Sequence, residues 1–440
     1  MSQETKAPAS AWFALGVLVA VSIFASLDRQ VLTIALEPVR TTFSLTDLQI
    51  GMLQGLGLTL AAAVGGIPLA WLADRFDRRV VLCLCVLGWS AATAWRGVAA
   101  DFNELFMGTV GLALAEAGLG PIVYAMIPSL FRGRQRAAAN LVFYTASMVG
   151  FSLGMVLGGL AFGWVHAQVL LLPASLQSLE AWRVVFFAVA LPGPVFALLV
   201  MAIRAEHGRA AAPPMQLTQP RPAGNLLPYL RKHWRTLAGV FGSAAACVSA
   251  FSPIMAWLAP VLTRVFGVPP SEAGVQLGAV LGAASLVGIG LATLSQRRWG
   301  ARYGDALAMQ TGQYLAAAAL LPAALLGVVE SAQWALGAVF VLGALAVAFS
   351  ALLPGLWQGI APAPLRARVI ALAGAAMAVS GAVGPLAVGG VSDLLADHPN
   401  GLLMAIAAIS APLMLLSAVL MRWVRKPLQV TLELGRLQQQ

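Results

Sequence analysis

Long apolar runs, separated by short polar stretches, follow one another along almost the whole chain. A membrane-spanning helix needs roughly 20 mostly apolar residues, and twelve runs of about that length or more are present. Gly and Pro are frequent inside them, which spanning helices tolerate better than soluble helices do. The pattern therefore predicts twelve transmembrane helices and an all-α membrane protein. The runs lie at 11–36, 48–73, 80–100, 103–129, 137–165, 183–203, 237–264, 273–296, 305–328, 332–358, 367–392 and 401–424.

One long polar stretch interrupts this pattern near the middle of the chain. Residues 204–236 are rich in proline and basic side chains, which is typical of a linker. Six apolar runs precede it and six follow it. We therefore expect an N-terminal six-helix bundle at 1–203, a cytoplasmic linker at 204–236 and a C-terminal six-helix bundle at 237–440.

The two halves also repeat each other in sequence. The segment 66–75, which follows the second run, aligns without gaps on 288–297, and 131–134 matches 365–368 after the fourth run of each half. Glycines recur in the fifth run of both halves, where small residues allow close helix packing. Two parallel six-helix repeats are typical of a transporter that works by alternating access. The repeated glycines are Gly150, Gly154, Gly158 and Gly159, and Gly381, Gly384, Gly389 and Gly390.

Composition excludes several other classes of protein. Hydrophobic residues make up 60% of the chain and charged residues only 10%, whereas a soluble domain has about a quarter charged. The excess of basic residues therefore does not indicate nucleic-acid binding, since such proteins keep a soluble basic body. Cys83, Cys85 and Cys247 lie inside apolar runs without metal-ligand spacing to histidine. We expect no metal and no cofactor, and no nucleotide-binding loop for ATP is present.

The basic residues predict an orientation. If the N-terminus is cytoplasmic and the helices alternate, all but five of the 27 Lys and Arg residues fall on the inner side, as the positive-inside rule requires. Both termini are then cytoplasmic, in an integral protein of a bacterial inner membrane. Arg96, near the outer end of the third helix, is expected to reach the outer headgroups with its long side chain. The five exceptions are Arg29, within a helix, and Arg40, Arg96, Arg183 and Arg264.

Two motifs resemble known transporters. The stretch Ala70–Arg79 matches the loop motif between helices two and three of the major facilitator superfamily, with Ala70 and Asp77 replacing two usual glycines. Leu27–Leu32 in helix one and Ala115–Pro121 in helix four resemble the Spinster-like group of that superfamily, bacterial members included. The organic-anion symporters of the superfamily also carry Asp-Arg in helix one. The resemblance implies the major facilitator fold, two pseudo-symmetric bundles, and a protein that is often monomeric.

Three charged residues are expected inside the membrane. Asp28 and Arg29 lie in helix one and Glu116 lies midway through helix four, at depths within one or two helical turns of each other. Buried charges in membranes usually line a cavity and have partners. Two carboxylates that share one arginine cannot both be satisfied when ionised, so one of them should bind a proton in some states. We predict that Asp28 and Glu116 carry protons and that Arg29 changes partner, the alternative being a static salt-bridge cluster.

Other candidates follow from position. Asp74, Arg75 and Arg78 of the loop motif are predicted to form a cytoplasmic gate, the alternative for the arginines being simple topogenic charge. The second half has no acidic residue deep in a span, and its apolar and aromatic wall suits an amphipathic substrate better than a sugar. Lipid-facing side chains are the alternative for each substrate candidate. The substrate-binding candidates are Trp257, Gln276, Trp357, Gln358 and Tyr124.

These observations predict a secondary active transporter coupled to protons. Its substrate would be an amphipathic lipid-like molecule, such as a lysolipid or a sphingoid base, or another hydrophobic compound, as the Spinster resemblance implies. The alternative is a proton-coupled symporter of a small organic anion that pairs with Arg29. A transport-inactive membrane sensor is disfavoured because the charged residues of helices one and four are all present. No catalytic His, Cys or Ser arrangement is recognisable, so an enzyme is not expected. The expected partners are the lipid bilayer, the small substrate and protons.

Overall fold

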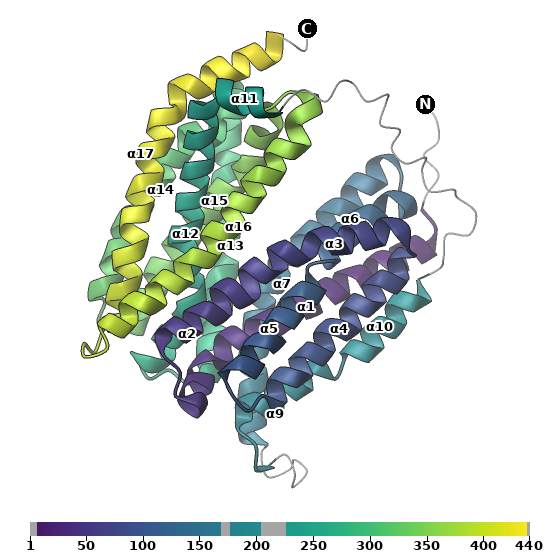
Figure 1. Cartoon of the computed structure of the whole chain (residues 1–440), viewed down its shortest axis with the longest axis vertical. Helices are drawn as coiled ribbons and strands as arrows, with labels where there is room; N and C mark the ends of the chain where they lie inside the picture. The colour runs from purple at the N-terminus through teal and green to yellow at the C-terminus, as the bar shows by residue number, and fades with distance from the viewer. Residues whose placement is uncertain (1–6, 169–176, 204–225, 438–440) are drawn as a thin grey trace. The chain divides into compact units, whose positions relative to one another are not determined.

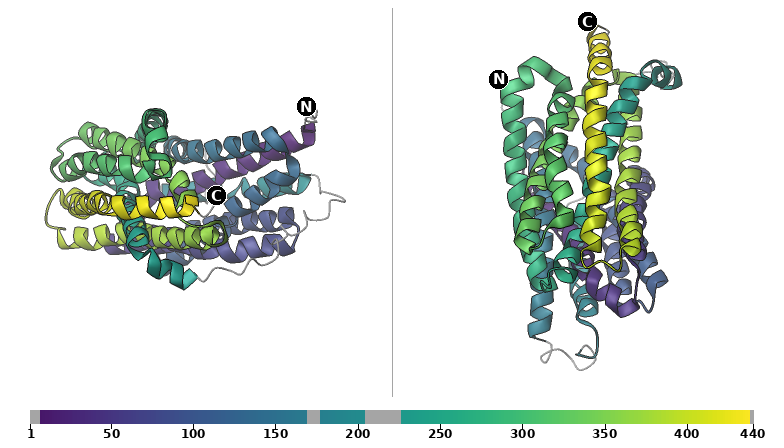
Figure 2. Two further views of the ribbon diagram at one scale, coloured as in Figure 1. Left: turned by 90° about the horizontal axis from the view of Figure 1, so that it is seen from above. Right: turned by 90° about the vertical axis from the view of Figure 1, so that its left-hand side faces the viewer.

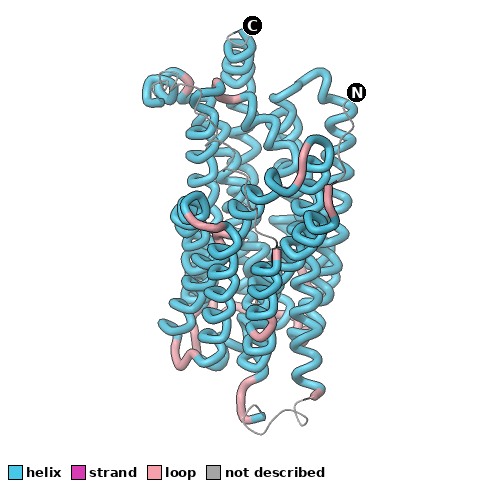
Figure 3. The backbone as a smooth tube through the Cα atoms, turned by 90° about the vertical axis from the view of Figure 1, so that its right-hand side faces the viewer, coloured by secondary structure: helices cyan, strands magenta, loops and turns pink. Residues whose placement is uncertain are grey.

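The computed structural model describes residues 7–168, 177–203 and 226–437. Within these ranges the backbone is helical nearly throughout and contains no strand (Figure 3). The helices are α1 (Ala9–Phe43), α2 (Asp47–Met52), the π-helical η1 (Leu53–Leu60), α3 (Ala61–Arg75), α4 (Arg78–Val98), α5 (Phe102–Glu116), α6 (Leu119–Leu130), α7 (Gly133–Ala167), α9 (Ala181–Ala190), α10 (Gly193–Ala202), α11 (Leu226–Lys232), α12 (Trp234–Arg264), α13 (Pro270–Tyr303), the 3₁₀ turn η3 (Gly304–Ala306), α14 (Leu307–Leu325), the 3₁₀ turn η4 (Leu326–Val328), α15 (Ala332–Gly359), α16 (Ala363–Leu394) and α17 (Gly401–Leu437).

The prediction of twelve spanning helices is confirmed. Twelve helical segments of the described chain are long and apolar enough to cross a membrane, and each contains one predicted run or most of it. Large apolar side chains, including Ile67, Leu191, Leu286 and Leu394, are exposed on these segments. Water would disfavour so much exposed apolar surface and lipid would not, so the protein is an integral membrane protein.

Three of the spans are divided within their length, and the ninth, Leu307–Val328, ends in the 3₁₀ turn η4. The second consists of α2, η1 and α3, and the sixth of α9 and α10. The fourth is divided at Ala117–Gly118, between α5 and α6. Pro121 explains this last break, because it has no N–H to donate to the carbonyl of Ala117 and its ring crowds that carbonyl. The sequence predicted one continuous helix at 103–129, so the break is an addition to that prediction.

By its internal contacts the chain forms two compact units. Unit 1 comprises Met1–Gly208 together with Leu258–Ala279, and unit 2 comprises Arg209–Trp257 with Val280–Gln440. The end of α12 and the beginning of α13 thus belong to unit 1. Of the predicted linker, 204–225 lies outside the described residues, while 226–236 is helical in α11 and the first residues of α12. The predicted bundle boundaries stay a prediction.

In unit 1, α1 packs along α7 over much of its length. Glycine makes the close approach possible: a Cβ on Gly154 would lie 2.9 Å from the carbonyl oxygen of Ser26 and 3.0 Å from the Cα of Leu27. Real Cβ atoms are not found this close to backbone atoms, so any larger residue would push the two helices apart. The predicted close packing is therefore observed at Gly154, where it fixes the position of α1 immediately before Asp28.

In unit 2, α14 packs against α15 and α17, and α17 packs against α16. The C-terminal turns of α17 continue beyond its neighbours, as the yellow helix of Figures 1 and 2 shows. One buried apolar cluster joins α12, α14, α15, α16 and α17, and α11 packs against its edge. Its largest buried members are Met309, Phe349, Leu356, Met421 and Leu428.

Candidate functional site

Asp28 lies deep inside unit 1 and is held by two side chains of α4. Its carboxylate is 1% exposed and accepts a hydrogen bond of 2.7 Å from Nη2 of Arg96. The hydroxyl of Thr93, one turn before Arg96, donates to the same carboxylate at 2.7 Å. A buried carboxylate without partners would cost several kcal/mol. The Arg96 and Thr93 contacts therefore offset part of the cost of burying Asp28.

The structure contradicts the prediction that Arg96 reaches the outer headgroups. The Arg96 side chain is 0% exposed, and its guanidinium lies over the ring of Phe186 at 4.7 Å. Gly108 of α5 makes room for it, since a Cβ there would lie 2.8 Å from Cγ of Arg96. An ion pair with Asp28 satisfies the charge inside the bundle, so the side chain does not need to reach water. Nε and Nη1 of Arg96 have no partner among the described residues.

Glu116 and Arg29 form a second pair, which differs from the first in its exposure. Arg29 donates to one carboxylate oxygen of Glu116 from Nη2 at 2.7 Å and from Nε at 3.1 Å. The Arg29 side chain is 39% exposed, whereas that of Glu116 is 6% exposed. Glu116 is the last residue of α5, directly before the break at Ala117–Gly118. The pair is thus open to its surroundings on the arginine side and sits at a discontinuity of its helix.

The expectation that Asp28 and Glu116 share one arginine is therefore wrong for this structure. Successive residues of a helix point about 100° apart, so Asp28 and Arg29 face different neighbours. Asp28 turns to α4 and Arg29 turns to α5. The site contains two carboxylates and two arginines, with no net charge when all four are ionised. A proton that binds Glu116 would free Arg29 without disturbing the Asp28–Arg96 pair.

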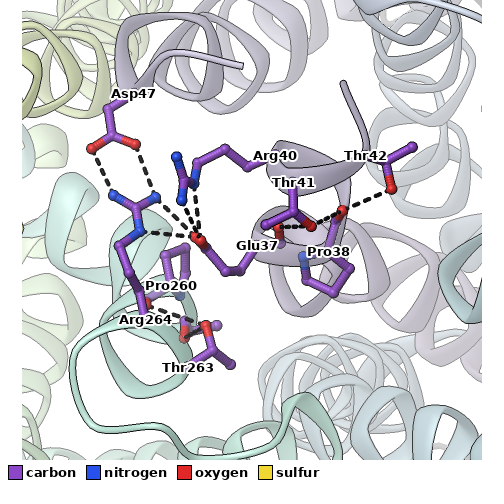
Figure 4. A network of polar contacts seen from close by, with 10 residues as sticks. Glu37, Pro38, Arg40, Thr41, Thr42, Asp47, Pro260, Thr263 and Arg264 are labelled. Carbon is purple, nitrogen blue, oxygen red and sulfur yellow. Dashed lines mark hydrogen bonds and ion pairs between the residues drawn. The ribbon is translucent and has the colours of Figure 1, made fainter. Parts of the chain in front are cut away.

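A third charged cluster lies at the C-terminal end of α1 (Figure 4). Arg264 of α12 donates to Glu37 of α1 at 2.8 Å and to both carboxylate oxygens of Asp47 of α2, at 2.8 and 2.9 Å. Arg40 donates to the second oxygen of Glu37 at 2.9 Å. All four residues belong to unit 1. One bidentate guanidinium thus connects three helices, the geometry in which arginine pairs are strongest.

The arginines that break the positive-inside pattern share one property. Each has an acidic partner within 3 Å in unit 1, which means that its charge is neutralised locally. A charge at such a position is costly without a counter-charge, so the exceptions in the sequence marked ion pairs. This signal could have identified the cluster of Glu37 and Asp47 with Arg264, which was not predicted from the sequence. The pairs are Arg29–Glu116, Arg40–Glu37, Arg96–Asp28, Arg183–Glu180, and Arg264 with Glu37 and Asp47.

The loop motif places its charges at the junction of α3 and α4. Asp74 is exposed and makes no ion pair with a described residue, while Arg75 lies over the ring of Trp71 at 4.2 Å. Arg78 donates to the carbonyl of Ala125 at 3.1 Å and so ties α4 to α6. The gate predicted for Asp74, Arg75 and Arg78 stays a prediction.

The neighbouring Asp77 has the clearest ion pair of the motif. It accepts hydrogen bonds from the side chain of Arg79, which hold the pKa of the Asp77 carboxyl below its usual range. Arg79 also donates to the carbonyl of Ile203, at the end of α10, at 2.8 Å. These contacts connect the motif to the last span of the first half.

The substrate-binding candidates are scattered. Trp257 is buried and donates from Nε1 to the carbonyl of Pro385, so it packs unit 2 internally in this structure. Trp357 is half-buried against Phe241, at 6.0 Å between ring centroids. Gln276 is half-buried in the part of α13 that belongs to unit 1.

Tyr124 is exposed and meets Phe143 edge-on at 5.3 Å. The side chain of Gln358 lies outside the described residues. The substrate roles of all five candidates stay predictions.

Comparison with known proteins decides the family. The sequence model of the Major Facilitator Superfamily matches residues 18–385, which is most of the chain. The chain belongs to the Major Facilitator Superfamily. It is therefore a membrane transporter with this superfamily's twelve-helix fold, as the loop motif and the repeated halves suggested.

Several transporters of other organisms are similar to this chain. An MFS-type efflux pump of Mycolicibacterium smegmatis is 28% identical over 398 residues, which cover 89% of this chain and 86% of the pump. A probable 4-methylmuconolactone transporter of Cupriavidus pinatubonensis is 28% identical over 54% of this chain and 52% of its own. Among solved structures, a bacterial homologue of the human lysosomal transporter Spinster, inward-facing and unoccupied, matches with a TM-score of 0.77. That pair is 24% identical and covers 97% of this chain and 98% of the other, so the Spinster-like fold is observed.

Proposed function

We propose that this transporter is proton-coupled and that Glu116 carries the coupled proton. The observation that supports the proposal is the difference between the two buried ion pairs of unit 1. Asp28 is held by two residues of α4, Thr93 and Arg96, and is enclosed, whereas among the described residues Glu116 pairs with Arg29, whose side chain is more than a third exposed. Arg29 can therefore leave Glu116 toward its exposed side, whereas Arg96 is enclosed with Asp28.

The release of Arg29 gives the proton a structural consequence. A neutral Glu116 no longer holds the guanidinium, and Arg29 is then free to bind another anionic group. Because the break after Glu116 lacks the hydrogen bond to the carbonyl of Ala117, the end of α5 can move more easily than a continuous helix. Asp28 and Arg96, whose pair is fully enclosed, hold α1 against α4 throughout. In this account Asp28 positions Arg29 and does not itself carry the proton.

For the substrate we propose an amphipathic or hydrophobic compound, of the lysolipid or sphingoid type. The aromatic character of the candidates supports this class, because Trp357 with its neighbour Phe241 in unit 2, and separately Tyr124 in unit 1, offer apolar surface and few polar groups. The relative named as an efflux pump and the fold likeness to a Spinster homologue are in keeping with such a substrate.

A small organic anion is the second candidate, and one observation favours it. The partly exposed guanidinium of Arg29 is a ready partner for a carboxylate. Relatives over parts of the chain include a cis,cis-muconate transport protein of Acinetobacter baylyi and a D-galactonate transporter of Escherichia coli. If the substrate binds Arg29 directly, Glu116 must be protonated first, so binding of the anion would be coupled to proton uptake.

Substrate binding to the purified protein distinguishes the two classes. Lysophosphatidylcholine, sphingosine and cis,cis-muconate would each be added to weakly buffered protein in detergent, with thermal unfolding and the pH change both recorded. The proposal predicts that a lipid-like probe raises the unfolding temperature and displaces a proton in wild type but not in Glu116→Gln. Stabilisation by muconate alone, with proton uptake, would establish the organic-anion alternative. Stabilisation without any pH change would exclude coupling through Glu116.

A further inference from the structure

A cluster of basic and aromatic side chains lies where α11, α12 and α17 of unit 2 come together. We call it the basic platform. Three of its cations follow one another at the end of α11 and the beginning of α12, and three lie about two-thirds along α17. Each set includes one exposed tryptophan beside the cations. The platform consists of Arg231, Lys232, Trp234, Arg235, Arg422, Trp423, Arg425 and Lys426.

Direct contacts hold the two sides of the platform together. The hydroxyl groups of Thr236 and Thr431 are 2.8 Å apart, and Nδ1 of His233 is 3.2 Å from the same Thr431. The rings of Trp234 and Trp423 approach to 6.5 Å between centroids. The cations of α12 and α17 are therefore neighbours in space although about 190 residues separate them in the sequence.

The short helix α11 is fixed to the same unit. Leu226, Tyr229 and Leu230 pack against the buried cluster of unit 2. The hydroxyl of Tyr229 donates a hydrogen bond to the carbonyl of Ile360, at the end of α15. Burial of the Tyr229 ring raises the pKa of its phenol, so this hydroxyl keeps its proton at neutral pH. Arg231 and Lys232 at the end of α11 are thus presented by an anchored helix.

The charge of the platform is not neutralised within its own helices. Helices α11 and α12 contain no acidic residue, and the only acidic residue of α17 is Glu433. None of the six cations forms an ion pair with a described residue. This distinguishes them from the five arginines of unit 1, each of which has a carboxylate within 3 Å.

The position of the platform suggests which group neutralises its positive charge. Its residues lie at the beginning of the span Trp234–Arg264 and in the last third of the span Gly401–Glu433, where an apolar run changes to a polar one. Tryptophan is enriched at this boundary of a membrane, because its ring is apolar and its N–H is polar. Groups of four to eight cations beside a spanning helix attract anionic headgroups. We propose that the basic platform binds the phosphate headgroups of anionic phospholipids in the surrounding membrane.

A basic pair elsewhere in unit 2 provides a control, because it represents basic residues whose role is only to orient the protein in the membrane. Arg297 and Arg298 are exposed near the end of α13, and Arg298 lies over the ring of Trp299 at 5.8 Å. They resemble the platform in charge and in their aromatic neighbour. The platform differs in having six cations on helices that contact one another, so only there do we expect several cations to reach one headgroup.

The test is lipid binding to the full-length protein, measured by native mass spectrometry and by thermal unfolding in detergent. Dioleoylphosphatidylglycerol is the anionic probe, dioleoylphosphatidylcholine the neutral one, and sodium phosphate the free anion. The variants are Arg231→Gln with Lys232→Gln, Arg425→Gln with Lys426→Gln, and the control Arg297→Gln with Arg298→Gln. Unfolding in phosphatidylcholine alone shows whether each variant is folded.

We expect phosphatidylglycerol to stabilise the wild type and the control more than phosphatidylcholine does. Each platform variant should bind it roughly tenfold more weakly or worse, since each lost cation costs about a factor of five. An equal loss in the control pair, or no loss in either platform variant, would overturn the proposal. Equal stabilisation by sodium phosphate would assign the site to a free anion, which also contradicts it. The proposal does not rest on proton coupling, so the two can fail separately.

Discussion

At the scale of single residues, the enclosed pair Asp28–Arg96 shows how a carboxylate and a guanidinium can both be buried inside a membrane bundle. Arg96 and Thr93 donate to Asp28, and neither Asp28 nor Arg96 reaches the surface. Removing one partner of such a pair leaves the other charge buried without compensation. Removing both charges together avoids that cost, because the remaining amides can still form hydrogen bonds.

Arg96→Gln is therefore expected to destabilise the protein more than the double variant Asp28→Asn with Arg96→Gln. The single change should lower the free energy of unfolding by about 3–5 kcal/mol, the usual cost of breaking a buried ion pair. The double variant should recover most of this loss. Thermal unfolding of both variants in the same detergent measures the difference. Equal stability of Arg96→Gln and wild type would show that the pair contributes nothing to the fold.

The sequence could identify Asp28, Arg29 and Glu116 because ionisable residues inside apolar runs are rare. It could not assign their partners. The direction of a side chain depends on the rotation of its helix about its axis, and a displacement of one residue turns it by about 100°. Arg96 was misplaced for this reason: its depth suggested the headgroups, and only the packing of α4 against α1 and α5 shows that it faces Asp28.

At the scale of helices, the break between α5 and α6 places Glu116 at a helix end. The sequence predicted the whole span at 103–129, and the fourth helical span extends from Phe102 to Leu130. Apolar periodicity does not detect a local break, because the residues on both sides are equally apolar. Pro121 was the available sign, since a proline inside a helix removes one hydrogen bond and crowds the preceding turn.

Pro121→Ala should restore the missing hydrogen bond to the carbonyl of Ala117 and stiffen the span at Glu116. We expect unchanged or slightly higher thermal stability, together with a severalfold lower transport rate, because the end of α5 can no longer adjust. Pro128→Ala, in the same α6 but twelve residues after Glu116, serves as the matched control. Similar transport by the two variants and wild type would contradict a role for the break.

The Arg264 cluster connects α1, α2 and the end of α12, so its loss should weaken the packing of all three helices. Arg264→Gln removes the cation that Glu37 and Asp47 share, and we expect a loss of roughly 1–3 kcal/mol in unfolding free energy. Arg264→Lys keeps the charge but cannot bind both carboxylates in a bidentate way, so its stability should be intermediate. Thermal unfolding at low and high salt checks the order. A lysine variant no better than glutamine would show that geometry alone matters.

At the scale of the whole molecule, the two units differ in their chemistry although the halves repeat in sequence. The ion pairs described above all lie in unit 1, whereas the hydrogen bonds described in unit 2 join neutral groups, such as Ser249 and the carbonyl of Ser380. The sequence anticipated this asymmetry from the absence of acidic residues deep in the second half. It could not anticipate that Leu258–Ala279 would pack with unit 1. Hydrophobic runs identify the helices of a chain but not the helices against which each one packs.

The proposed coupling mechanism depends on Glu116 carrying a proton that Asp28 does not carry. Reconstitution into proteoliposomes tests this with two assays on the same preparation, substrate exchange without a gradient and accumulation driven by a pH gradient. Glu116→Gln imitates the protonated state, so it should retain exchange and lose accumulation driven by the pH gradient. In Asp28→Asn with Arg96→Gln, both activities should persist. The opposite pattern, with coupled accumulation intact in Glu116→Gln or lost only in the double variant, would contradict the account.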